Sequence, residues 1–475
     1  MKRNSFFSED VSEARNGTGI DAGDDELRAM NALEAGIRKG VPASHFKDTL
    51  GNPLSPRQRR WLFERLERAD TWLKLRLFHY TGMATGDVSW MDRGFEALCE
   101  TMLADAASDL GISADARIAM HRHDVLLPLR VNWAGGWSDV APYCIERGGT
   151  VLNAAILLNG AFPVRVSLTR LEQRQIVLES TDMGVRQAFD SLAALQCADD
   201  SSDPLALHKA VLMASGVVPM HGGEMEDLLT RLGGGFILRT EVTGVPNGSG
   251  LGTSCILSAA CIKALYGFLG LDFSEEDVCG RVMTAEQLTS TGGGWEDQIG
   301  ALWPGVKYLS SAPGMRQRVS IQTLMLSEDT MSELRRRYVL IYTGQRRQTK
   351  RILRDIMGDY LGNETEVVQA LAEIQRVAAS MRAELEHGHV DEFARLMSYH
   401  WGLSKQMDSG SSNARIERIF EAADGLLDGR MCVGSGGGGF LQVMLKSDAT
   451  REQLAGLLHE AFRDEGVAVW DCEIV

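Results

Sequence analysis

The sequence has no long hydrophobic run and no paired arrangement of cysteines. No apolar segment reaches the ~18 residues that a membrane-spanning helix needs, and the N-terminus has no apolar core of signal-peptide length. The eight cysteines are scattered, with no CxxC pair and no close histidine, so we expect neither a disulfide framework nor a zinc site. These absences favour a cytoplasmic protein with reduced cysteines and no membrane partner.

Positive charge is also scarce. Lysine and arginine number 49 against 64 aspartate and glutamate residues, which gives a formal net charge of −15. Such a chain is a poor partner for nucleic acid or an anionic membrane surface, although a local pocket can still bind an anion. The 475 residues, 44% of them hydrophobic, suit a globular protein of two or three domains. The sequence leaves a homo-oligomer open.

Strands and helices alternate through the last three quarters of the chain, which predicts an α+β fold. Apolar or alternating stretches predict strands at 126–132, 150–158, 162–168, 236–242, 338–342 and 440–445. Upstream, Ser55 and Pro56 predict the start of a helix whose apolar face continues to Leu77. We therefore expect a disordered tail and helical extension over 1–115, one lobe over 116–335 and a second over 336–475.

A glycine-rich loop from Val245 to Cys255 is the sharpest local signal, and a helical apolar pattern follows it directly. Glycine lets an anion approach backbone N–H groups, and a helix N-terminus offers unpaired N–H donors. An ordinary glycine-rich turn with helix-capping hydroxyls is the alternative. The loop is neither a Walker A motif nor a Rossmann fingerprint, since it lacks the lysine of the first and the spacing of the second. We expect it to bind the phosphates of a nucleotide through Pro246, Gly248, Ser249, Gly250, Leu251, Gly252, Thr253 and Ser254.

A second loop, from Leu129 to Asp139, reads LRVNWAGGWSD. A carboxylate suits vicinal hydroxyl donors, and a tryptophan can lay an apolar face on a sugar ring. A strand and turn with a capping aspartate is the alternative. We expect the substrate to contact Gly136, Trp137 and Asp139 from this loop, together with Trp295 from a later turn.

Two carboxylates flank the segment LTSTGGGW, with Glu286 eleven residues before Asp297. Phosphoryl transfer needs one carboxylate at the acceptor hydroxyl and oxygen ligands for a hard metal ion. Asp297 fits the first role, and Glu286 with Ser254 fits the second. The alternative for Glu286 is a solvated helix residue, and the alternative for Asp297 is an ordinary turn residue. A last glycine-rich segment, 433–440, contains four consecutive glycines, which a loop that merely connects two strands rarely needs, although such a connector is the alternative. Its candidate residues are Gly434, Gly436, Gly437 and Gly438.

The three glycine-containing motifs, in this order, resemble those of the GHMP kinases. The phosphate loop resembles PxGxGLG[ST]S, and 433–440 resembles GxGxGG. The second loop, 129–139, which we call the sugar loop, is similar to the galactokinase-type pattern RVNLIGEHTD. Gly136 and Trp137 replace the Glu-His of that pattern, which disfavours galactose as the substrate. The resemblance implies a two-lobed GHMP fold that uses ATP and Mg²⁺, with Asp297 and Arg130 as catalytic residues and Ser254 and Glu286 on the metal.

The stretch AGGWSDVAPYCIERGGTVLNAAILLNG is similar to the L-fucokinase half of the bifunctional fucokinase/fucose-1-phosphate guanylyltransferases, and 292–309 and 342–353 support that branch. The resemblance implies phosphorylation of the anomeric hydroxyl of L-fucose, by a chain without the guanylyltransferase half. It extends less closely to bacterial heptose-phosphate kinases, so another sugar, such as a heptose phosphate, is an alternative. A catalytically silent sugar sensor is a third, which the joint presence of Asp297, Ser254 and Glu286 disfavours.

Overall fold

The computed structural model describes the chain except for residues 1–22, 108–110, 112–115, 201, 290–291 and 347–349. The predicted disordered tail lies outside the described residues. The chain divides into two compact units, one of residues up to 101 together with 354–369, and one of 102–353 together with 370–475. None of the described helices is both long and apolar enough to cross a bilayer. The α+β fold with an N-terminal helical region is confirmed, whereas the predicted boundary between two lobes after residue 335 stays a prediction.

The first unit is helical. It contains α2 (Gly23–Lys39), η2 (Ala43–Phe46), α3 (Pro56–Arg68), α4 (Thr71–Thr85) and most of α5 (Ser89–Ala107). The predicted start at Ser55 is confirmed, since its side chain accepts a hydrogen bond from the Gln58 N–H. The single helix expected to continue to Leu77 is wrong. Ala69 is extended, and the Asp70 carboxylate accepts from the Leu73 N–H at 2.8 Å and begins a second helix.

Residues 354–369 join this unit, which sequence periodicity did not indicate. The Tyr80 hydroxyl donates to the carbonyls of Val41 and Gly362 at 2.6 and 3.1 Å, and the Ala43 N–H also donates to Gly362. The Ser44 hydroxyl donates to Glu364 at 2.8 Å. The bonds to Gly362 and Glu364 connect positions more than 280 residues apart in the chain, and such long-range pairing leaves no local pattern to read.

Three sheets organise the second unit. The first has the order β1-β4-β7-β5-β6, and the second has the order β11-β12-β10-β13. The third has the order β14-β3-β8-β9, with β2 also paired to β3. Their bounds are β1 (Arg122–Leu127), β2 (Leu129–Ala134), β3 (Thr150–Leu158), β4 (Val164–Leu171), β5 (Ile176–Ser180), β6 (Val185–Phe189), β7 (Gly235–Val242), β8 (Val306–Ser311), β9 (Val319–Thr323), β10 (Tyr338–Tyr342), β11 (Leu427–Cys432), β12 (Phe440–Leu445), β13 (Ala468–Trp470) and β14 (Cys472–Ile474).

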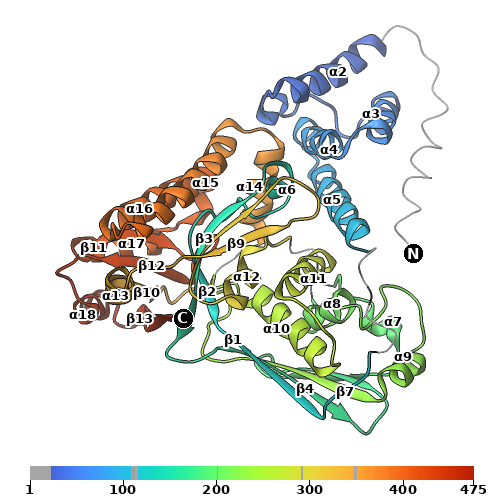
Figure 1. Cartoon of the computed structure of the whole chain (residues 1–475). Coiled ribbons are helices and arrows are strands. Elements are labelled where there is room, and N and C mark those ends of the chain that lie inside the picture. The colour runs from blue at the N-terminus through green and yellow to red at the C-terminus, as the bar shows by residue number, and fades with distance from the viewer. Residues whose placement is uncertain (1–22, 108–110, 112–115, 201, 290–291, 347–349) are drawn as a thin grey trace. The chain divides into compact units, whose positions relative to one another are not determined.

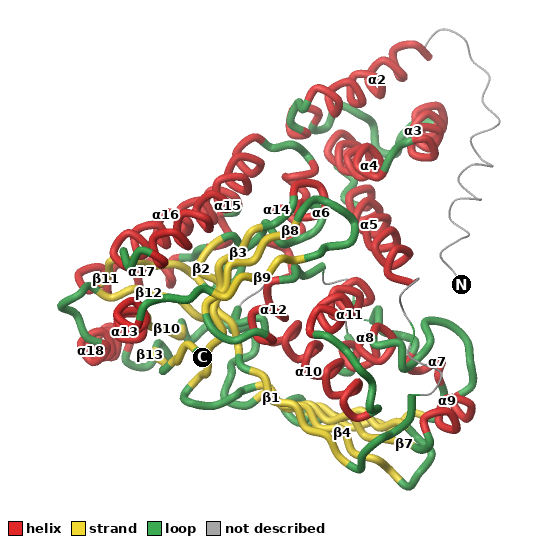
Figure 2. The backbone as a smooth tube through the Cα atoms, viewed as in Figure 1, coloured by secondary structure: helices red, strands yellow, loops and turns green. Residues whose placement is uncertain are grey.

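Helices cover these sheets. In Figure 1, α10 (Thr253–Phe268) lies over β1, β4 and β7, with α11 (Glu275–Leu288) beside it. Figure 2 shows α16 (Val390–Met407) along the sheet that contains β11 and β12. The other helices that lie wholly in the second unit are α6 (Tyr143–Arg147), α7 (Leu192–Leu195), α8 (Ala206–Ala214), α9 (Met225–Leu232), α12 (Glu296–Leu302), α13 (Glu328–Arg337), α17 (Ala414–Ala423) and α18 (Arg451–Phe462), with the short turns η3 (Ser409–Ser411) and η4 (Asp424–Leu426). The residues of α14 (Lys350–Leu361) and α15 (Thr365–Glu386) are divided between the two units.

The six strands expected from the sequence are all present within a few residues. The strand expected at 126–132 is two strands, β1 and β2, because Pro128 cannot donate a ladder hydrogen bond and separates them. Near the C-terminus, β14 pairs with β3, and the Val475 N–H donates to the Ala155 carbonyl at 3.1 Å. The end of the chain is therefore part of the sheet that also holds β2.

Candidate active site

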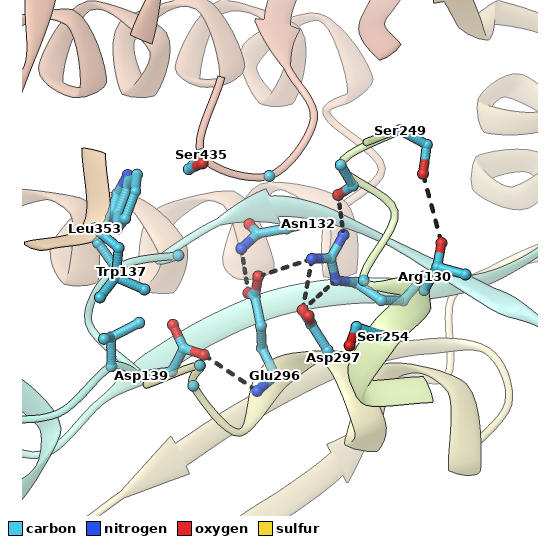
Figure 3. Close-up of a pocket in the computed structure, with 18 of the residues that line it drawn as sticks. Arg130, Asn132, Trp137, Asp139, Ser249, Ser254, Glu296, Asp297, Leu353 and Ser435 are labelled. Atoms are coloured by element: carbon cyan, nitrogen blue, oxygen red, sulfur yellow. Dashed lines mark hydrogen bonds and ion pairs between the residues drawn. The ribbon is translucent and has the colours of Figure 1, made fainter. Parts of the chain in front are cut away.

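One cavity of the second unit, of about 330 Å³, contains most of the predicted site residues. Most of its lining comes from β2 with the loop after it, the loop before α10 with the start of that helix, α11, the turn into α12, and α16. Figure 3 shows side chains from several of these segments. The predicted residues that line it are Arg130, Gly136, Trp137, Asp139, Gly248, Ser249, Gly250, Gly252, Thr253, Ser254, Glu286, Asp297 and Gly434.

An ion pair stands at the middle of this cavity. Arg130 lies on β2, a strand that is buried along its whole length. Its Nε and Nη2 donate to Asp297 Oδ1 at 2.8 and 2.5 Å, and its Nη1 donates to the Gly250 carbonyl at 2.9 Å. Burial works to lower the pKa of Arg130, but the charges of Asp297 and Glu296 outweigh it and raise that pKa. The guanidinium is thus a fixed cation that joins the Asp297 turn to the glycine-rich loop.

The glycine-rich loop has the backbone that an anion site requires. Gly248, Gly250 and Gly252 have φ of 73°, 84° and 71°, values that side chains with a Cβ rarely adopt. α10 begins directly after Gly252, and no side chain caps it. The first N–H groups of α10 therefore have no capping side chain, and Thr253 and Ser254 present hydroxyls in the same turn.

Gly252 also sets how closely this loop approaches Asp297. A Cβ built on Gly252 would lie 2.8 Å from Asp297 Cγ and 2.9 Å from its Oδ2. Since Oδ1 accepts both hydrogen bonds from Arg130, Oδ2 is the oxygen on the side of the loop. The carboxylate is held between a guanidinium and the backbone of the phosphate loop.

At the other end of the cavity, Asp139 and Glu296 lie together. The Glu296 N–H donates to Asp139 Oδ2 at 3.1 Å, and Asn132 donates its side-chain N–H to Glu296 Oε2. Burial, then the charge of Asp297, raises the pKa of Asp139 to about 7. Burial and the charge of Asp139 raise the pKa of Glu296 well above its usual range. Sequence reasoning missed Glu296, although its place next to Asp297 in the glycine-rich turn was a usable signal.

The sugar loop is held from α16 as well. The Gly135 N–H donates to His400 Nε2 at 3.0 Å, and burial lowers the pKa of His400 to about 4, so the imidazole is neutral near pH 7. Trp137 adopts φ of 82°, uncommon for a residue with a Cβ, and lines the cavity. His400 was also missed, because a lone histidine on a helix gives no pattern that marks a site.

Ser254 and Glu286 both line the cavity, and Glu286 is 5% exposed. Burial, then the charges of Glu286 and Asp297, raises the pKa of the Cys255 thiol well above its usual value, which places that thiol near both carboxylates. No group of three His, Cys, Asp or Glu in the described part of the chain forms a metal cage. One hydroxyl and one carboxylate instead suit an ion that takes its other oxygen ligands from phosphates and water, as Mg²⁺ does.

The glycine-rich segment 433–440 contacts the phosphate loop, but only one of its four predicted glycines lines the cavity. The Phe440 N–H donates to the Ser249 carbonyl at 3.0 Å. Gly434 lines the cavity with Ser435, whereas Gly436, Gly437 and Gly438 do not. The Gly437 N–H donates to the Ser411 carbonyl at 2.6 Å, so this part of the segment packs against η3.

Three further predicted residues do not reach the cavity wall, namely Pro246, Leu251 and Trp295. Leu251 is fully buried. Trp295 is 1% exposed and packs in an apolar cluster with Val151, Ile299 and Leu309. An aromatic residue in a glycine-rich turn can serve the core as readily as a ligand, and sequence alone does not separate the two.

Comparison with known proteins agrees with this arrangement. The GHMP kinases N-terminal domain family matches residues 224–305, which include the phosphate loop and the Asp297 turn. The chain is 35% identical over 339 residues to the bifunctional fucokinase/GDP-fucose pyrophosphorylase of Arabidopsis thaliana, with 71% of this chain and 31% of that protein covered. It is 33% identical over 337 residues to the L-fucokinase/L-fucose-1-P guanylyltransferase of Bacteroides fragilis, with 70% and 35% covered. The chain thus spans about a third of the length of these two relatives.

A third relative is covered almost completely. The D-glycero-alpha-D-manno-heptose 7-phosphate kinase of Campylobacter jejuni subsp. jejuni is 28% identical over 353 residues, with 72% of this chain and 97% of that protein covered. Among solved structures, Lactococcus lactis galactokinase complexed with galactose has a TM-score of 0.54 at 14% identity, covering 80% of this chain and 99% of its own. Methanococcus jannaschii mevalonate kinase has a TM-score of 0.55 at 15% identity, covering 75% and 99%. These two likenesses concern the fold alone, whereas the family match over 224–305 shows that this chain contains a GHMP kinases N-terminal domain.

Proposed function

We propose that the chain is an ATP-dependent sugar kinase that phosphorylates the anomeric hydroxyl of L-fucose. The observation that carries the proposal is the Arg130–Asp297 pair, which stands between a phosphate loop and a carboxyl-lined pocket within one cavity. The choice of L-fucose rests on the two relatives named as fucokinases, which match over about 70% of this chain.

In this reaction the sugar oxygen forms a bond to the γ-phosphorus of ATP, and the bond from that phosphorus to the leaving ADP oxygen breaks. The loop from Gly248 to Gly252 and the start of α10 would hold the phosphates through backbone N–H groups. Ser254 and Glu286 would hold Mg²⁺, which neutralises phosphate charge when bound. Residues of this chain would thus bind the phosphates mainly through backbone.

Asp297 is the group that meets the acceptor hydroxyl. Its Oδ1 is occupied by Arg130, so Oδ2, on the side of the phosphate loop, is the oxygen available to orient the hydroxyl or accept its proton. Arg130 holds this carboxylate in place through its two hydrogen bonds and would offset charge on the transferring group. Because the transition state is loose, orientation can matter as much as proton removal.

A heptose phosphate is the second candidate, favoured by the near-complete coverage of the heptose 7-phosphate kinase. The charge of the cavity disfavours it. Among the described residues that line the cavity, Arg130 is the only lysine or arginine, and it is already paired with Asp297. A second phosphate on the sugar needs a cation of its own, whereas a neutral sugar does not.

A panel of sugars tests the proposal. ADP release is measured with ATP and Mg²⁺ for L-fucose, D-galactose, D-mannose and a heptose 7-phosphate, and phosphorus NMR identifies the product. We expect L-fucose to be used best and to yield the anomeric phosphate. Preference for the heptose phosphate would replace the sugar but keep the reaction. Sugar binding without ADP release would favour the silent sensor instead.

A further inference from the structure

We propose that Glu296 is a second sugar-binding residue, and that it shares one proton with Asp139 so that the two carboxyl groups offer one donor and one acceptor to neighbouring sugar hydroxyls. This inference rests on the proposed function, because it names how the same cavity recognises its acceptor. The relevant side chains are drawn in Figure 3.

The geometry fixes both carboxyl groups at one end of the cavity. Glu296 is the first residue of α12, and its backbone is bonded on both sides, from its N–H to Asp139 Oδ2 and from Asn153 Nδ2 to its carbonyl at 3.1 Å. Its side chain is 10% exposed and accepts from Asn132 at Oε2. Asp139 is 2% exposed, so neither carboxyl group can turn into bulk water.

The charges around this pair do not balance. Among the residues that the structure describes, the charged and titratable groups that act on it are Arg130 from β2, Asp297 from α12 and the buried thiol of Cys144 from α6. Arg130 Nη2 lies 2.5 Å from Asp297 but 3.5 Å from Glu296 Oε1. The nearest cation is therefore committed mainly to Asp297. Two buried carboxylates with so little compensation cannot both stay ionised.

A single shared proton resolves this imbalance, and the pair titrates as a unit. Burial raises the pKa of Asp139 to about 7 and also raises the pKa of Glu296, and both shifts favour holding a proton. A sugar hydroxyl is at once a donor and an acceptor, and a protonated carboxyl beside a carboxylate matches two such hydroxyls. An arginine or lysine at this place would offer donors alone.

Two substitutions separate the sugar role from the proton. Glu296→Ala removes the carboxyl group and should raise the KM for the sugar about 10- to 100-fold, while the KM for ATP stays within about twofold. Glu296→Gln keeps the shape with a fixed neutral amide. In the wild type, kcat/KM for the sugar should fall about fivefold between pH 7 and pH 8 as the shared proton is lost. In Glu296→Gln this fall should be absent.

A second readout needs no sugar. A carboxyl group whose folded pKa is raised stabilises the fold below its unfolded pKa, near 4, and that stability is lost as the pH rises toward the folded pKa. The Tm of Glu296→Gln should therefore gain on the wild type as the pH goes from 5 to 8. The matched control is Glu328→Gln, at the first position of α13, where the side chain is 84% exposed. Its Tm difference from the wild type should not change with pH.

The outcomes are distinct. If the wild type phosphorylates its sugar and Glu296→Ala keeps a wild-type sugar KM, the sugar-binding role is overturned alone. If the Tm difference of Glu296→Gln stays constant from pH 5 to 8, the shared proton is overturned, whatever the substrate. If the wild type uses no sugar of the panel, the proposed function fails and the sugar role fails with it, while the Tm comparison still decides the proton.

Discussion

The two ends of the cavity are built from different chemical groups. The phosphate end is mostly backbone, with three glycines at positive φ and the uncapped start of α10. The sugar end is made of side chains: Asp139 and Glu296 are buried, and Asn132 donates a hydrogen bond to Glu296. Backbone N–H groups cannot titrate, whereas buried carboxyls must take up a proton or find a cation. The first end suits a ligand of constant charge, and the second suits hydroxyls whose donors and acceptors have to be matched.

Asp297 lies where the two ends meet, and its replacement should have the largest effect. Asp297→Asn keeps the shape and removes the charge, so kcat should fall by roughly 10²- to 10⁴-fold. The KM values for ATP and sugar should change little, because other groups bind them. ADP release under saturating substrates measures this. Asp329→Asn, at the second position of α13, is the matched control and should keep full activity. A wild-type rate in Asp297→Asn would contradict the mechanism.

The sugar end alone should respond to Asp139→Ala. Loss of a charge-assisted hydrogen bond of about 1–3 kcal/mol should raise the sugar KM about 5- to 150-fold and leave the KM for ATP unchanged. Initial rates at varied sugar and then varied ATP separate the two ends. A rise in the ATP KM with an unchanged sugar KM would mean that the two ends have been assigned the wrong way round.

The backbone end can be tested through a single methyl group. Gly252→Ala adds a Cβ at φ of 71°, 2.8 Å from Asp297 Cγ, so it should lower kcat/KM for ATP about 5- to 30-fold. Gly244→Ala is the matched control, since Gly244 has φ of 68° but nothing within 4 Å of its Cβ position. Gly244→Ala would have the same unfavourable positive φ but no close contact at the added Cβ. Equal losses in both variants would show that approach to Asp297 is not what Gly252 provides.

The same difference between the two ends explains how far sequence reasoning reached. Glycines followed by an apolar helix pattern are local, and they predicted both the loop and α10. The roles of individual site residues stay predictions. Glu296 and Trp295 show why: they are neighbours in one turn, yet one lines the cavity and the other fills the core. Which of the two side chains faces the cavity depends on the direction of α12. Long-range contacts, such as the hydrogen bond from Asn153 to the Glu296 carbonyl, set that direction.

Two larger features of the fold could not be predicted, also because they depend on long-range contacts. Residues 354–369 group with the N-terminal helices through hydrogen bonds of Gly362 and Glu364, and no local sequence pattern indicates this grouping. β14 joins the sheet of β2 from the last residues of the chain. Strands and caps depend on nearest neighbours and were largely predictable, while the grouping of distant segments was not.

The smallest effect is expected from a substitution at the proposed Mg²⁺ site, because Ser254 supplies only one neutral ligand there. Ser254 is exposed at the second position of α10, whereas Glu286, which lines the same cavity, is buried. In Ser254→Ala the carboxylate, the phosphates and water would remain as oxygen ligands, so only one neutral hydroxyl contact of about 0.5–1.5 kcal/mol is lost. The Mg²⁺ concentration for half-maximal ADP release should therefore rise about 2- to 10-fold, with a modest fall in turnover at saturating Mg²⁺. Ser332→Ala, on the exposed side of α13, is the control and should leave the Mg²⁺ curve unchanged. If Ser254→Ala matches the wild type at limiting Mg²⁺, the hydroxyl is not a metal ligand, and the phosphate end binds its ligand through backbone alone.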